Sequence, residues 1–397
     1  MPRDLSLLAG AVGVSALGDW LAVTPLALHL HDRTGSGVLV ALLFVAIWAP
    51  SIVFAPIAGA LVDRFETRRL LALVSLAQAG VAVALAFAGS TWAVLALAAL
   101  LGTGWAISQP AEFSLVPSVA GRRIAEANGL VETVRYIGFA LGPLLGGILS
   151  AAGGMRAAML VNAASFVVVT AVALVLRVER RPARADGEAK ERARDGIAFL
   201  FRDRVLGLVV AVAFVSLLFM TASAPAEVFF AVDVLDVGAI GFGALWTSWT
   251  IGMALGALVL ARRARSALAG AAIVAIVVQS LGLALPTLWL VFAFALVSYL
   301  VGGAAHGLKN VLVRTLIHER VPVRLHGRAF AAYNGLRNSA ELVAVIGGGA
   351  LVAAIGARWT LFLAGALPAL AGAAGLVVYR RLRIDERVEA PSISAAS

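Results

Sequence analysis

The charged side chains that interrupt long apolar runs are the residues of this chain with the clearest capacity for chemistry. Removing an ionised group from water costs free energy unless the group is paired, so each of them needs a partner or a function. We expect them to line a cavity or to carry protons. They are Asp19, Glu132, Arg135, Glu227, Arg337 and Glu341.

Two of these acids have no oppositely charged neighbour along the chain. Asp19 is the one acidic residue of the first apolar run and lies near its middle. A carboxylate in a water-poor site can be neutral at one stage of a cycle and ionised at another, so Asp19 is a candidate for proton coupling. The alternative is a structural carboxylate that hydrogen bonds between helices satisfy. Glu227, which follows Pro225, is a candidate for an outer gate or a proton entry.

The other four charges form two pairs. Glu132 and Arg135 lie three residues apart and Arg337 and Glu341 lie four apart, so each pair shares one helical face. We expect the first pair to be a structural ion pair. The second pair either lines a cavity or neutralises itself.

Three more charges, Glu112, Lys309 and Arg314, stand near the ends of apolar runs, and we place them near the cytoplasmic ends of their helices, where we expect boundary anchors. Lys309 and Arg314 have stems long enough to reach the membrane surface.

The elements that must position these side chains are transmembrane helices. The chain has 397 residues, of which 61% are hydrophobic and 14% charged, and its mean hydropathy is +0.96. Residues 70–111 and 266–308 contain no Asp, Glu, Lys or Arg and read as helical hairpins, because about 20 apolar residues span a bilayer. The runs are continuous and too long for barrel strands.

The sequence predicts an all-α membrane protein of twelve spans in two pseudo-symmetric six-helix bundles around a central cavity. Residues 1–176 form the first bundle, 177–204 a polar linker, 205–380 the second bundle and 381–397 a tail. The motif Asn128-Gly129-Leu130 recurs as Asn334-Gly335-Leu336, which supports two related halves. The expected helices are 5–31, 38–61, 70–88, 92–115, 128–152, 157–176, 205–232, 241–260, 267–285, 288–316, 328–355 and 358–380.

Most of the 32 lysines and arginines fall in the termini and in alternate loops, including the linker. The positive-inside rule then places both termini in the cytoplasm and the protein in the cell membrane. This placement explains the net charge of +10 without a nucleic-acid partner. The chain has no cysteine and no nucleotide-binding loop, so we expect neither an enzyme nor a metal or cofactor site.

The loop over residues 59–69 reads Gly-Ala-Leu-Val-Asp-Arg-Phe-Glu-Thr-Arg-Arg. It resembles the signature loop of the major facilitator superfamily, usually G-x-L-x-D-R-x-x-x-R-R, whose aspartate latches the cytoplasmic side closed. Glu66 stands where the family usually has a glycine, and the second-half copy has Leu260 at the position of the aspartate. The resemblance implies a gating role for Gly59, Asp63, Arg64, Arg68 and Arg69.

A second motif spaces glycines along the fifth predicted helix: Gly129, Gly138, Gly142, Pro143, Gly146 and Gly147. Small residues four apart let membrane helices pack at backbone distance. The spacing resembles the antiporter motif of drug:proton exporters, which implies a role in sealing against proton leak. A generic packing stripe is the alternative.

Further stretches, such as residues 17–20, are similar to the branch that contains macrolide-efflux proteins and enterobactin (siderophore) exporters. One departure is the lack of the arginine that many drug:proton antiporters carry in helix four, for which Arg135 is a possible substitute. The resemblance implies a monomeric exporter of small amphipathic or hydrophobic compounds that exchanges them for protons. Nutrient uptake and a non-transporting membrane sensor are the alternative functions.

Overall fold

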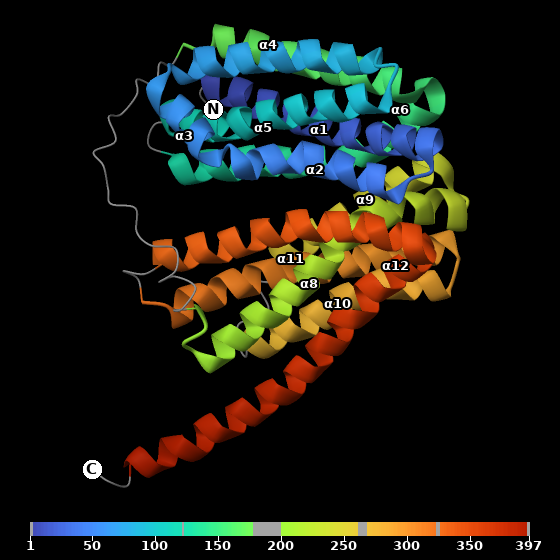
Figure 1. The fold of residues 1–397 in the computed structure, drawn as a ribbon. Helices are drawn as coiled ribbons and strands as arrows, with labels where there is room; N and C mark the ends of the chain where they lie inside the picture. The colour runs from blue at the N-terminus through green and yellow to red at the C-terminus, as the bar shows by residue number, and fades with distance from the viewer. Residues whose placement is uncertain (1–2, 121–122, 178–199, 261–267, 323–325, 395–397) are drawn as a thin grey trace. The chain divides into compact units, whose positions relative to one another are not determined.

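The computed structural model describes residues 3–120, 123–177, 200–260, 268–322 and 326–394, and every regular element in these ranges is a helix (Figure 1). The described residues contain nine helices that are long and apolar enough to cross a membrane. The number is ten if the bent pair α2 (Gly37–Val53) and α3 (Ala55–Arg64) forms one span. The expected all-helical, multi-pass architecture is therefore confirmed.

Two helices are much longer than a bilayer requires. α6 (Ile124–Val175) has 52 residues and α12 (His326–Ser394) has 69. Each contains a glycine in the left-handed region, Gly154 with φ 65° and Gly356 with φ 78°, where a side chain would be strained. Since about 20 residues span the bilayer, each long helix is two spans joined at its glycine. Dividing both long helices and counting the bent pair once gives twelve apolar segments among the described residues, which is compatible with the predicted number.

The remaining elements follow the predicted runs to within a few residues. The second predicted helix differs, because it is bent by 56° between α2 and α3, with Pro50 before the bend and Pro56 after it. Proline removes a backbone donor and so favours a break at this place. The other elements are α1 (Arg3–Thr34), α4 (Thr67–Ala86), α5 (Thr91–Ala120), α8 (Arg204–Phe229), the π-helix η1 (Phe230–Val234), α9 (Gly238–Leu255), the π-helix η2 (Gly256–Leu260), α10 (Leu268–Leu288) and α11 (Phe292–Arg320).

The chain forms two compact units, and their boundary does not follow the chain order. The first comprises Met1–Glu188 and Glu227–Thr247, and the second comprises Ala189–Ala226 and Ser248–Ser397. The end of α8, η1 and the first part of α9 therefore pack in the first unit, although they come from the second half of the sequence. Most of the expected linker (residues 178–199) and the last residues of the tail (395–397) lie outside the described residues.

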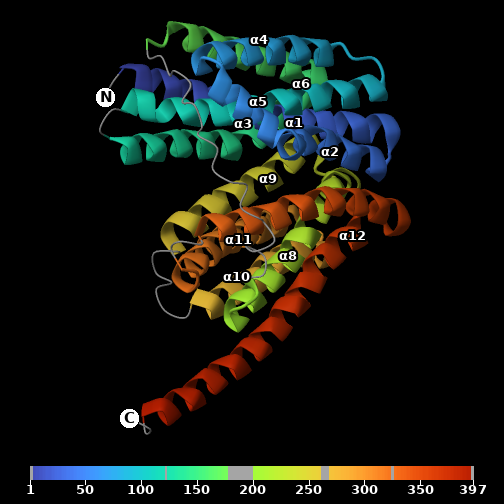
Figure 2. The same ribbon diagram turned by 60° about the vertical axis from the view of Figure 1, so that its left-hand side comes forward.

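Each unit has its own apolar core. In the first unit the core joins α1, α4, α5 and α6 through side chains such as Leu8, Leu71 and Leu115. In the second unit the core is formed by α8, α10, α11 and α12. The turn within α12 can be followed in Figures 1 and 2, where the ribbon passes from orange to red. Large apolar side chains also stay uncovered, for example Leu73 at 68% exposed. A surface of this kind suits lipid as its solvent.

In the first unit, α1 and α6 approach one another closely along their backbones. A Cβ atom added at Gly142 would lie 2.7 Å from Trp20 Cβ and 3.0 Å from the Leu17 carbonyl oxygen, and one added at Gly146 would collide with the carbonyl oxygen of Leu21. Gly138 lies equally close to the backbone of Leu17. Three glycines at intervals of four therefore let α6 lie directly on α1, as small residues do in membrane helix pairs.

We predict that Gly146→Val destabilises the protein by about 1–3 kcal/mol, because the new side chain would meet backbone that cannot turn away. The control is Gly129→Ala on the same helix, where a Cβ atom would have nothing within 4 Å. The measurement is the midpoint of thermal unfolding in detergent. Equal midpoints for Gly146→Val and the parent protein would contradict the proposed close packing.

Candidate functional site

Asp19 of α1 lies between two cavities of the first unit. One is lined by apolar and aromatic side chains that include Trp20, Trp48 and Trp105. The other is lined by Ser15, Trp105, Phe139 and the charged pair described below. Asp19 and Trp105 border both cavities. The carboxyl group therefore stands where an apolar space meets a charged one.

The charged pair consists of Arg135 of α6 and Glu112 of α5. The Arg135 Nη2 atom donates to Glu112 Oε2 at 3.0 Å, and the two side chains are only 7% and 6% exposed. The guanidinium group also lies over the ring of Phe113, 4.3 Å from its centroid. Burial makes the pairing necessary, because a single charge left alone at this depth would cost several kcal/mol.

This pairing differs from the one that the sequence suggests. In the described residues Arg135 has no ion pair with Glu132; its side chain reaches across to α5 instead of along α6. Glu112 is 5% exposed and is thus no boundary anchor. The sequence does hold a signal for this role: Glu112 is the first charged residue after the uncharged run 70–111, and such an isolated acid needs a partner.

Asp19 itself has no hydrogen bond or ion pair within the described part of the chain, although Glu112 and Arg135 both lie close enough to act on it electrostatically. The structural alternative requires other helices to donate hydrogen bonds to this carboxyl group, and the described residues supply none. If all three groups are ionised, the cluster carries one net negative charge. A proton on Asp19 would make the cluster neutral.

Aromatic rings form one wall of this region. Trp20 lies 5.2 Å from Phe139 and 5.7 Å from Trp246, measured between ring centroids. Phe44 stacks on Trp246 at 6.1 Å and contacts Trp48 at 5.0 Å. Such a wall offers a large apolar contact area with few polar groups, which is typical of sites for apolar ligands.

The glycine motif is divided between two packing partners. Three glycines of α6 pack against α1: Gly138, Gly142 and Gly146. Gly147 and Pro143, also in α6, instead contact α9, at Ala239 and Gly243 respectively. Gly129 has open space around it. The motif thus brings α6 against two other helices of the first unit, and its sealing role stays a prediction.

The signature loop separates into a capping part and an exposed part. The Glu66 carboxylate accepts from the backbone N–H groups of Arg68 and Arg69 at 3.3 and 3.1 Å, and so caps the N-terminus of α4. Arg68 also donates to the carbonyl oxygen of Leu176. Asp63 and its neighbour Arg64 are exposed, and Asp63 has no polar partner in the described residues. Gly59 contacts no other helix closely, since a Cβ atom there would meet nothing within 4 Å.

The second unit contains a polar cluster of its own. His306 of α11 is within hydrogen-bonding distance of Gln279 (3.1 Å), Lys309 (3.3 Å) and Asn310 (2.9 Å). Lys309 is 2% exposed, so the expectation of a boundary anchor is wrong at this position as well.

Three further charged residues of the sequence analysis lie in the second half of the chain. Arg337 donates to Glu341 at 2.8 Å, with the two side chains 41% and 23% exposed, so this pair forms as its spacing indicates. Glu227 is half-buried near the end of α8. Among the described residues, no group of three or more His, Cys, Asp or Glu side chains could hold a metal ion.

Comparison with known proteins places this architecture in a family. Residues 8–345 match the profile of the Major Facilitator Superfamily. The chain is 26% identical to the uncharacterized MFS-type transporter YfiS of Bacillus subtilis, over 94% of this chain and 93% of that protein. It is 28% identical to the multidrug efflux pump Tap of Mycobacterium tuberculosis, over 97% of this chain and 95% of that protein.

The fold is also found among solved structures. The crystal structure of the nucleoside transporter NupG aligns with a TM-score of 0.77 at 13% identity, covering 95% of this chain and 99% of that one. At this identity the likeness concerns the fold alone. The family match over most of the sequence, together with the apolar spans, leads to one conclusion: the chain belongs to the Major Facilitator Superfamily and is a multi-pass membrane transporter.

Proposed function

We propose that this transporter exports small amphipathic or hydrophobic compounds in exchange for protons, by alternating access. The observation that carries the proposal is the position of Asp19, whose carboxyl group borders an apolar aromatic cavity on one side and the Arg135–Glu112 pair on the other. A compound in the apolar cavity and a proton on Asp19 would occupy adjacent places. Competition between them is the simplest way to couple two opposite fluxes.

The composition of the cavity supports the proposed substrate class. Its lining includes three tryptophans and several aliphatic side chains, with Asp19 as its one charged group. Apolar walls with few polar groups bind by burial of apolar surface and tolerate varied shapes. The likeness to Tap, named a multidrug efflux pump, favours the same class.

The other residues of the proposed mechanism act around this centre. We assign to Arg135 and Glu112 the electrostatic environment of the Asp19 carboxyl group. The candidates for cavity lining or proton transfer are Arg337, Glu341, Glu132 and Glu227. The signature loop, with Asp63, Arg64, Arg68 and Arg69, is assigned to gating at the cytoplasmic side. This assignment assumes cytoplasmic termini, as the positive-inside rule predicts, and a monomer.

Transport in inverted membrane vesicles tests the proposal directly. Vesicles with an acidic interior should accumulate a permanently charged, fluorescent amphipathic cation, because protons leaving the vesicle drive the compound inward. A permanent charge excludes passive trapping of a weak base. A protonophore should abolish the accumulation, and vesicles without the transporter serve as the control. If no member of a panel of amphiphiles moves in response to the gradient, the export proposal is wrong.

Asp19→Asn should abolish gradient-driven accumulation and leave membrane insertion intact, because the amide cannot release a proton. Glu126→Gln is the matched control, since Glu126 is a 72% exposed acid that pairs with Arg123 at 3.5 Å on the surface of α6. It should transport like the parent protein. Proton-coupled transport by Asp19→Asn at the parent rate would remove Asp19 from the mechanism.

Glu112→Met should lower the free energy of unfolding by about 3 kcal/mol, because it leaves the buried guanidinium of Arg135 without a partner. The double variant Glu112→Met with Arg135→Met should recover most of that loss, since no charge stays unpaired. Glu132→Gln should have no effect, because Glu132 is not the partner. Thermal unfolding in detergent measures all three, and additive losses in the double variant would argue against the pair.

A further inference from the structure

We propose that His31, Asp32 and Asp233 form a proton-binding site that holds the outer end of α1 against η1 and releases it when the proton leaves. The site extends the proposed function to the outer gate, and its placement at the outer face rests on the cytoplasmic termini proposed above. We name these three residues the outer proton site.

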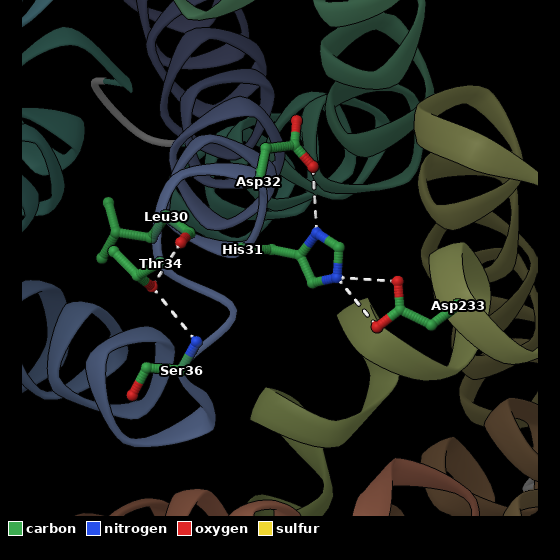
Figure 3. Close-up of polar contacts among 6 residues, drawn as sticks. All are labelled: Leu30, His31, Asp32, Thr34, Ser36 and Asp233. Atoms are coloured by element: carbon green, nitrogen blue, oxygen red, sulfur yellow. Dashed lines mark hydrogen bonds and ion pairs between the residues drawn. The ribbon is translucent and has the colours of Figure 1, made fainter.

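The geometry of the outer proton site is shown in Figure 3. His31 Nδ1 lies 2.9 Å from Asp32 Oδ1, and Nε2 lies 3.0 Å from both carboxylate oxygens of Asp233. The ring of Phe229 packs edge-on against the imidazole, with the centroids 4.6 Å apart. Both nitrogens of one imidazole ring therefore face a carboxylate.

This arrangement requires a proton beyond those of a neutral imidazole. A neutral imidazole has one N–H donor, and ionised carboxylates only accept, so one of the two contacts would be a repulsion between lone pairs. Both contacts are favourable when His31 is an imidazolium, or when one carboxyl group carries the proton. In either case the three groups share one proton more than a neutral imidazole and two carboxylates would carry.

The end of α1 is built to hold His31 in place. Thr34 donates to the carbonyl oxygen of Leu30 at 2.6 Å and accepts from the Ser36 N–H group at 3.2 Å (Figure 3). Gly35 between them turns the chain with φ 60°. The side chain of His31 is 10% exposed, whereas those of Asp32 and Asp233 are 71% and 51% exposed. The imidazole is thus fixed, and water reaches the acids that exchange its proton.

Other charged groups near the outer proton site do not compete for it. Arg33 points away and donates to the carbonyl oxygen of Gly89 at 2.6 Å. His29 lies on the same helix, and its Nε2 atom has no hydrogen-bond partner in the described residues. Asp236 and Glu227 follow and precede η1, and the carboxylates that act on His31 are Asp32 and Asp233.

The contact between His31 and Asp233 joins residues 202 positions apart. Asp233 belongs to the segment Glu227–Thr247, which packs in the first unit, whereas most of α8 before it belongs to the second. His31 and Asp233 therefore both lie in the first unit, and loss of the shared proton would leave lone pairs facing one another and release η1 from the end of α1. Histidine changes its charge between about pH 5 and 8, so external pH would set how often that happens.

Labelling of a single cysteine tests the inference without any transported compound. The chain has no cysteine, so Val23→Cys, at the lining of the cavity beside Asp19, gives a unique reporter. A membrane-impermeant maleimide is added to the outer face of right-side-out vesicles at pH 6 and pH 8. Ser90→Cys, on an exposed loop, corrects for the pH dependence of the reagent itself. We expect the corrected labelling rate to be about fivefold higher at pH 8.

His31→Gln should label at the same rate at both pH values, because glutamine cannot bind the proton, and Asp233→Asn should also remove the pH dependence, by an independent route. His29→Gln is the matched control, a histidine two residues away that should keep the fivefold difference. The inference is overturned if His31→Gln or Asp233→Asn keeps the difference, or if the reporter never labels. Because no substrate is present, pH-dependent labelling without efflux would reject the export proposal alone.

Discussion

Because α6 lies on α1 without intervening side chains, the two helices can place polar groups within reach of one another in the middle of the first unit. Gly138, Gly142 and Gly146 provide this contact at intervals of four residues. Arg135 lies one turn before Gly138 on the same helix, and so reaches the cavity that Asp19 borders. A larger side chain at one of these glycines would push α6 away from α1, and would so move the Arg135 guanidinium away from Asp19. The charge cluster thus depends on a packing contact that involves no charge.

The same cluster explains how a membrane protein can retain an unpaired acid. Arg135 and Glu112 neutralise one another at 3.0 Å, and Asp19 is left as the variable charge beside them. A proton on Asp19 removes the remaining net charge, and its loss restores it. The aromatic rings on the other side keep the adjacent space apolar. In the proposed mechanism, a proton and an apolar compound occupy adjacent sites whose occupancies depend on each other.

α1 carries both proposed proton-binding sites. Asp19 lies near its middle, and His31 lies near the end where the segment Glu227–Thr247 packs. A proton at His31 closes the contact with Asp233, and a proton at Asp19 changes the charge of the cavity. Both proposed proton sites are carried by one helix, so its position links the state of the outer end to the state of the centre.

The sequence by itself determined the helices, the division into spans and the isolation of Asp19. Length and hydropathy set the spans, since a bilayer fixes how many apolar residues a helix needs. The spacing of the glycines indicated close packing of the fifth span but not its partner. The ion-pair partner of Arg135 could not be predicted from residue spacing, because Glu132, three residues away, is as plausible a partner as Glu112 on another helix. Only the tertiary structure decided between them, by bringing Glu112 of α5 beside Arg135 of α6. The contact of His31 with Asp233, 202 residues away, was likewise decided by folding, because no spacing rule connects side chains so far apart in the sequence.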